Sequence, residues 1–184
     1  MIWLILGLAL WVGAHAFRRA APDARAKMGE AGKGLVAVLV VASVALMVIG
    51  YRSAPVVPLW NLPGFAVHLN NLLMVLAFYL YAASAAKGAK IWLGTKVRHP
   101  QLTAVQVWAV AHLLVNGDLA SLVLFGGLGL WAAVSVVLIN RAEGPWRVPA
   151  RAPLRKEIVA LAVTAVVVAV VMAIHTWLGV RPFG

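Results

Sequence analysis

The chain alternates between long apolar runs and short polar segments, and this pattern predicts its elements. Six apolar runs cover residues 1–17, 35–51, 65–86, 101–115, 119–139 and 158–180, and the fourth begins near His99. A helix needs about 20 apolar residues to cross a bilayer, with a lower limit near 17. The runs therefore predict an all-α protein, a polytopic transmembrane helical bundle with six transmembrane helices.

The connection between the fourth and fifth runs is Asn116-Gly117-Asp118. It is too short for anything but a tight turn, so these two helices should form an antiparallel hairpin. Prolines lie at or between the predicted helix ends, where proline is tolerated. They are Pro55, Pro58, Pro63, Pro100 and Pro145.

The basic residues gather in every second loop, which predicts the orientation of the chain. The first, third and fifth loops hold Arg18, Arg19, Arg25, Lys27, Lys33, Lys87, Lys90, Lys96, Arg98, Arg141, Arg147, Arg151, Arg155 and Lys156, whereas the opposite side has only Arg52 and Arg181. Cytoplasmic loops carry such an excess of lysine and arginine. Both termini should therefore be non-cytoplasmic, in a bacterial inner (cytoplasmic) membrane.

The first run also has a rival interpretation, because Ala14-His15-Ala16 matches a signal-peptidase site. A cleaved signal carries its positive charges before the apolar run. Here the arginines follow the run, which favours a retained span with its N-terminus outside.

Composition agrees with a membrane protein of one domain, covering residues 1–184. The chain is 64% hydrophobic and only 11% charged, with a mean hydropathy of +0.94. It has no cysteine, which excludes disulfides, zinc–thiolate sites and a cysteine nucleophile. The net charge of +11 is explained by the cytoplasmic loops and does not indicate nucleic acid. The expected partners are membrane lipids, a lipophilic substrate or a membrane redox partner, with the oligomeric state left open.

The five histidines lie in the predicted spans or at their edges. Ionisable groups in a bilayer are costly and usually face a bundle interior or a site. In the fourth span, one helical face collects a polar and aromatic stripe that should point inward. The stripe consists of Gln101, Val105, Trp108, His112 and Asn116.

The first span repeats part of this stripe. Trp11 precedes His15 by four residues, as Trp108 precedes His112, so each pair shares a helical face. At about 1.5 Å per residue, both histidines come close to the middle of a membrane core about 30 Å thick. Neutral imidazoles from two facing helices are the ligands that a six-coordinate haem iron needs.

Small residues near these histidines would leave room for a flat macrocycle, although ordinary close packing of helices is the simpler explanation. They are Gly7, Gly13, Ala14, Ala109 and Ala111.

The other histidines provide alternative ligands. His68 lies near the outer start of the third span with Asn70 and Asn71, and could pair with His112 if the site lies nearer the outer surface. His99 follows Arg98 at the cytoplasmic end of the fourth span, where it would cap or line that end. His175 lies in a span rich in valine and alanine and is interpreted as structural.

Several motifs in order give the chain a resemblance to the NnrU family, a family that also includes the 15-cis-ζ-carotene isomerase of plants and cyanobacteria. The resemblance covers about residues 1–140, followed by a cytoplasmic loop and the last helix. Its motifs are Met28-Gly-Glu-Ala-Gly-Lys-Gly34, Gly50-Tyr51, Leu59-Trp60, Arg98-His-Pro100, Trp108-x-x-Ala-His-Leu-Leu-x-Asn-Gly-Asp118 and Ala120-Ser121-x-x-x-Phe125-Gly126.

The resemblance implies a haem b membrane protein in which the family's ligand positions correspond to His15 and His112. Apart from the resemblance, Trp11 and Trp108 are expected among the cofactor-binding residues, and Arg98 or Arg52 is expected to bind a propionate. The implied activities are carotenoid cis-trans isomerisation or nitrite- and nitric oxide-linked redox metabolism (denitrification). The isomerase has a cysteine three residues before its second ligand, proposed as a redox-switched ligand. Ala109 stands there in this chain, so that switch should be absent.

Two rival functions belong to other classes. Arg98-His99-Pro100 also resembles the motif that helps hold S-adenosylmethionine in isoprenylcysteine methyltransferases, but no matching glutamate motif follows it. A cofactor-free scaffold or assembly subunit would use the histidines only for hydrogen bonds between helices, worth about 0.6 kcal/mol each in membranes. Aromatic residues at the predicted interfaces are typical of aromatic belts, and they are Tyr51, Trp60 and Trp146.

Overall fold

A computed structural model describes residues 1–86, 88–180 and 182, so Lys87 and Arg181 of the predicted loops lie outside the described residues. Its long elements are helices, and five helical segments are long and apolar enough to cross a membrane. They are α1 (Ile2–Ala20), α3 (Gly29–Arg52), α4 (Phe65–Ala85), the continuous segment Leu119–Glu143 and α8 (Leu154–Trp177). The remaining predicted span, the fourth in the sequence, is the shorter apolar helix α5 (Pro100–Val115), which has 16 residues.

The segment Leu119–Glu143 is not a uniform α-helix. It begins as α6 (Leu119–Ser121), continues through the π-helical turn η2 (Leu122–Gly126) and ends as α7 (Gly127–Glu143). Two short helices that the apolar pattern did not predict lie in the polar segments. They are α2 (Pro22–Lys27) and the 3₁₀ helix η1 (Trp92–Thr95).

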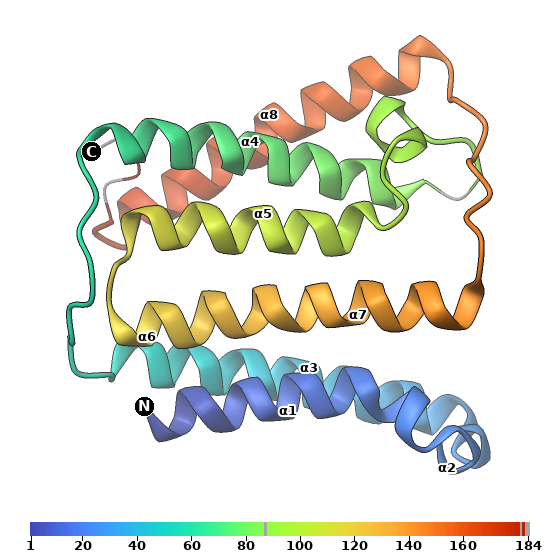
Figure 1. The fold of residues 1–184 in the computed structure, drawn as a ribbon, viewed down its shortest axis with the longest axis horizontal. Helices are drawn as coiled ribbons and strands as arrows, with labels where there is room; N and C mark the ends of the chain where they lie inside the picture. Colours follow the sequence, from blue (N-terminus) through green and yellow to red (C-terminus); the bar gives the residue numbers. More distant parts are fainter. Residues whose placement is uncertain (87, 181, 183–184) are drawn as a thin grey trace. The chain divides into compact units, whose positions relative to one another are not determined.

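The chain forms two compact units. The first consists of Met1–Leu59 and Asp118–Gly127, and the second of Trp60–Gly117 and the described residues from Leu128 onward. Figure 1 labels the helices of both units.

In the first unit, α1 and α3 pack side by side (Figure 1) through positions that lack bulky side chains. A β-carbon added to Gly7 would lie 2.7 Å from the backbone nitrogen of Met47 and 2.8 Å from the carbonyl oxygen of Ser43. Ser43 is fully buried and donates its hydroxyl to Val40 O at 2.7 Å. The smallness of Gly7 therefore serves close helix packing, as in other membrane helix pairs, rather than space for a macrocycle.

In the second unit, α4 lies between α5 and α8 and packs against both. Trp60 connects the loop before α4 to the end of α5 through two hydrogen bonds. Its backbone nitrogen donates to Gly117 O at 3.0 Å, and its indole nitrogen donates to Leu113 O at 3.0 Å. Trp60, predicted as an interfacial anchor, thus joins a loop to a helix.

The predicted antiparallel hairpin is confirmed within the second unit. The start of α5 lies beside the end of α7, because Arg98 donates to Gly144 O at 2.6 Å and pairs with Glu143 at 3.3 Å. His99 and Asn140 form a hydrogen bond of 2.8 Å at the same end.

Lys90 joins the loop after α4 to the segment before α8. Its backbone nitrogen donates to Ala150 O at 2.8 Å, and its carbonyl accepts from Ala152 N at 2.7 Å. Its ammonium group donates to Ser84 O at 3.0 Å and also to Ala86 O. A cation bound to the last carbonyls of α4 is stabilised by the helix dipole.

Candidate functional site

Two tryptophan–histidine pairs have the same local geometry in different helices. In α1, the rings of Trp11 and His15 have centroids 4.3 Å apart, and His15 Nδ1 lies 2.9 Å from Trp11 O. In α5, the rings of Trp108 and His112 have centroids 5.0 Å apart, and His112 Nδ1 lies 2.9 Å from Trp108 O. The equal spacing in the sequence therefore produces equal side-chain geometry.

These backbone contacts select one tautomer of each neutral ring. A carbonyl oxygen can only accept, so Nδ1 must donate and the neutral ring carries its lone pair on Nε2. Metal-bound histidines are commonly oriented in this way, through a hydrogen bond from the other ring nitrogen to a backbone carbonyl. Each of the two histidines, taken within its own unit, therefore has the orientation of a histidine that binds a metal such as haem iron.

The predicted stripe on α5 is present in its second half. Asn116 donates its amide to His112 O at 2.9 Å, and His112 in turn donates to Trp108 O. These three residues share one helical face, as the 100° spacing predicted. The two tryptophan–histidine pairs belong to different compact units, with Trp11 and His15 in the first.

The alternative ligands have other environments. His68 is exposed near the start of α4, and the neighbouring amides bond elsewhere: Asn70 donates to Asn71 Oδ1 at 3.0 Å, and Asn71 donates to Pro182 O at 2.9 Å. His175 bonds Val171 O at 2.8 Å. It has the same backbone bond as His15 and His112, but a valine four residues before it.

The Arg98-His99-Pro100 motif connects the start of α5 to the end of α7. His99 Nε2 donates a hydrogen bond to Asn140 Oδ1. The guanidinium of Arg98 donates to Gly144 O and to the carboxylate of Glu143. The guanidinium, predicted as a propionate partner, thus already has two protein acceptors that explain its position. The same contacts give the motif a role that does not involve S-adenosylmethionine.

The acids of the basic loops also have structural partners. Glu157 accepts from the Tyr79 hydroxyl and from Trp92 N, the latter at 2.8 Å. Together with the Glu143–Arg98 pair, this accounts for the two glutamates that follow the motif in the sequence.

A polar network in the first unit was missed by the sequence analysis. Tyr51 Oη and Ser121 Oγ are 2.8 Å apart, and Ser121 Oγ donates to Asp118 Oδ2 at 2.6 Å. Asp118 Oδ1 also accepts from Ser121 N at 3.0 Å and so caps α6. Ser121 is fully buried at the start of the π-helical turn, and the Tyr51 ring packs edge-on against Phe125.

The residues of this network all lie in the sequence motifs that carry the resemblance to the NnrU family. Gly50-Tyr51, Asp118, Ser121 and Phe125 were each noted, but nothing in the sequence indicated that they meet. Tyr51, predicted as an interfacial aromatic, uses its hydroxyl to join α3 to the end of α6.

Comparison with known proteins decides the family. The family model described as NnrU protein matches residues 3–182. The chain belongs to the NnrU family. The match extends well beyond the first 140 residues on which the motifs lie, so the last helix is part of the family's common architecture. No curated protein and no solved structure matches the chain.

Membership and the apolar helices together make this NnrU family chain an integral membrane protein.

Proposed function

We propose that the chain is a haem b protein of the bacterial inner membrane, with His15 and His112 as axial ligands of the iron. The observation that carries the proposal is the matched geometry of the two tryptophan–histidine pairs. Each histidine donates from Nδ1 to the carbonyl of the tryptophan four residues before it, which leaves the lone pair on Nε2. The indole ring beside each imidazole, tilted by 36° in the first pair and 48° in the second, then restricts the imidazole to that orientation.

Haem, when bound, supplies an iron that changes oxidation state, and the protein tunes its access and potential. The family resemblance implies carotenoid cis-trans isomerisation or nitrite- and nitric oxide-linked redox metabolism for such a site. Ala109 places no thiol beside His112, so a cysteine ligand switch is not part of the proposal.

The proposal is tested by the haem content of detergent-purified protein from cells supplied with haem. Reduced-minus-oxidised spectra and a pyridine haemochrome assay would be recorded for wild type, His15→Ala and His112→Ala. Loss of a single outer-shell partner lowers metal affinity by about 10–100-fold, so loss of either ligand should lower the affinity for haem at least that much and leave the purified variant with clearly less haem than wild type. His112→Met should keep haem with a raised potential, because methionine is a weaker axial ligand.

His175→Ala is the matched control, since His175 has the same backbone bond without a tryptophan. It should keep the full b-type spectrum, as should His68→Ala. Haem loss in His68→Ala with retention in His15→Ala would move the ligand pair to His68 and His112. A wild-type protein without any Soret band would contradict the proposal and favour a scaffold or a methyltransferase.

We also propose that all six apolar helices span the membrane, with the basic loops in the cytoplasm and both termini outside. The support is the distribution of lysine and arginine between alternate loops.

Single-cysteine labelling tests this orientation, because the wild-type chain has no cysteine. Val56 is 85% exposed in the loop after α3, and Ala24 is exposed in α2. In spheroplasts, a membrane-impermeant maleimide should label Val56→Cys and leave Ala24→Cys unlabelled until the membrane is opened. The reverse pattern would invert the proposed topology.

A further inference from the structure

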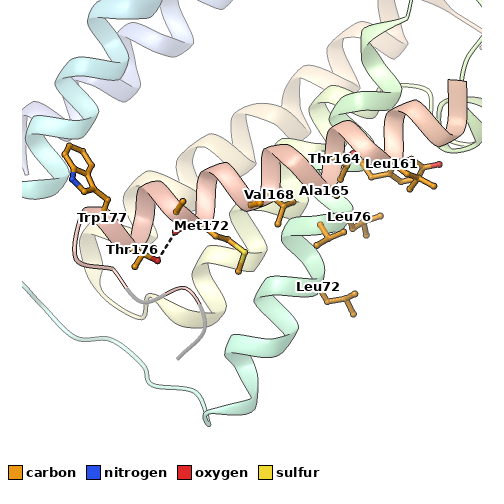
Figure 2. Close-up of a pocket in the computed structure, with 13 residues that line it drawn as sticks. Leu72, Leu76, Leu161, Thr164, Ala165, Val168, Met172, Thr176 and Trp177 are labelled. Atoms are coloured by element: carbon orange, nitrogen blue, oxygen red, sulfur yellow. Dashed lines mark hydrogen bonds between the residues drawn. The ribbon is translucent and has the colours of Figure 1, made fainter.

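A long apolar groove lies between α4 and α8 in the second unit, with a volume of about 1080 Å³ (Figure 2). Aliphatic side chains of both helices line it, including Leu72 and Leu76 from α4 and Leu161, Val168 and Met172 from α8. From Leu161 to Trp177 the groove follows α8 for about 24 Å, at about 1.5 Å per residue. Its shape and surface suit an elongated lipophilic molecule.

One polar group in this groove lacks a protein partner. Thr164 lines the groove and is only 4% exposed, and its hydroxyl makes no hydrogen bond to any of the described residues. Thr176, further along the same groove, shows the usual arrangement: its hydroxyl donates to Met172 O at 3.0 Å. The two threonines of the groove therefore differ in hydrogen bonding, and also in burial, because Thr176 is exposed.

An unpaired hydroxyl in this place is costly. A buried polar group without a partner costs about 1–3 kcal/mol, and water is absent from the bilayer core. A ligand oxygen in the groove would accept a hydrogen bond from the Thr164 hydroxyl and remove this cost. A pure hydrocarbon has no such oxygen and would leave the hydroxyl unpaired.

The depth of Thr164 narrows the ligand class. It lies six residues after Ile158, where the apolar run of α8 begins, and so about 9 Å into a membrane core about 30 Å thick. The ester and headgroup oxygens of phospholipids lie at the interface, well away from this depth. The acceptor must belong to a molecule whose oxygen enters the hydrocarbon core.

We propose that the α4–α8 groove binds a long-tailed quinone, with a ring carbonyl accepting a hydrogen bond from Thr164 and the tail lying along the aliphatic walls. Quinones combine an apolar tail with carbonyl oxygens that carry no charge, so the ring can enter the hydrocarbon core. This binding site lies within one compact unit and does not depend on haem.

The test compares Thr164→Val with Thr176→Val in detergent-purified full-length protein, with a decyl-substituted benzoquinone as the probe. Valine keeps the shape of threonine and removes the hydroxyl. Quenching of tryptophan fluorescence reports binding, because Trp177 lines the groove. We expect Kd to rise about three- to tenfold in Thr164→Val, as expected for the loss of one hydrogen bond, and to stay unchanged in Thr176→Val.

Thermal unfolding without ligand gives an independent readout. Removing an unpaired hydroxyl should raise the Tm of Thr164→Val, whereas a hydroxyl with a structural partner would lower it. Ala165→Phe, which fills the groove, should abolish binding of the probe and leave haem content unchanged.

Four results would overturn the proposal: no saturable binding to wild type, equal affinity in both threonine variants, a lowered Tm for Thr164→Val, or a dimer that Ala165→Phe dissociates. The last would show that a second copy of the chain occupies the groove.

Discussion

Gly50→Ala is expected to lower the unfolding temperature of the protein distinctly. A β-carbon at position 50 would lie 2.1 Å from the backbone nitrogen of Leu4 and 2.6 Å from its Cα atom. These are backbone atoms of α1, which cannot turn aside as the end of a side chain can, so α1 and α3 would have to separate. Overpacking costs about 1–3 kcal/mol, and separation would also expose the fully buried Leu4. Thermal unfolding in detergent, followed by circular dichroism, measures the loss.

Gly13→Ala is the matched control within α1, because a β-carbon there meets nothing within 4 Å. Alanine favours a helix over glycine by up to about 1 kcal/mol, so this variant should match or exceed the wild-type Tm. A Gly50→Ala protein as stable as Gly13→Ala would mean that α1 and α3 do not approach so closely.

Gly117→Ala, in the second unit, is expected to lower the unfolding temperature at least as much as Gly50→Ala does. Its β-carbon would lie 1.9 Å from the carbonyl oxygen of Trp60. Moving the two backbones apart would break the bond from Trp60 N to Gly117 O and strain the indole bond to Leu113 O. Overpacking costs about 1–3 kcal/mol, and each lost hydrogen bond adds about 0.5–1.5 kcal/mol.

The same thermal assay measures this effect. Gly64→Ala is the control, because Gly64 precedes α4 with a φ of −54° and a β-carbon there meets nothing within 4 Å. Trp60→Phe separates the two causes, since it removes the indole bond and keeps the backbone contact. An unchanged Tm for Gly117→Ala would show that the loop does not lie against the end of α5.

The apolar runs predicted the long helices well because side chains that avoid water are read directly from the sequence. The helix ends were less predictable. Helix α1 continues through Arg18 and Arg19, and α8 begins at Leu154, before its apolar run. Hydropathy marks the part of a helix that suits lipid, whereas a helix continues for as long as its backbone hydrogen bonds do.

The candidate site was predictable where it depends on one helix. The spacing of Trp108, His112 and Asn116 determines a shared face, and the structure has the hydrogen bonds expected of it. Contacts between segments far apart in the chain were not predictable. Nothing local to Tyr51 or Ser121 indicates that the two hydroxyls meet, because that contact depends on how α3 packs against the π-helical turn.

Lys90 changes how the positive charge of the chain should be counted. Its ammonium group is bound to the terminal carbonyls of α4, and Arg98 is bound to Glu143 and Gly144 O. These two cations compensate charge inside the protein, so they add little to the attraction for anionic lipid headgroups, which is worth about 1 kcal/mol per exposed basic residue. The formal charge of +11 therefore overstates what the loops offer to an acidic membrane surface.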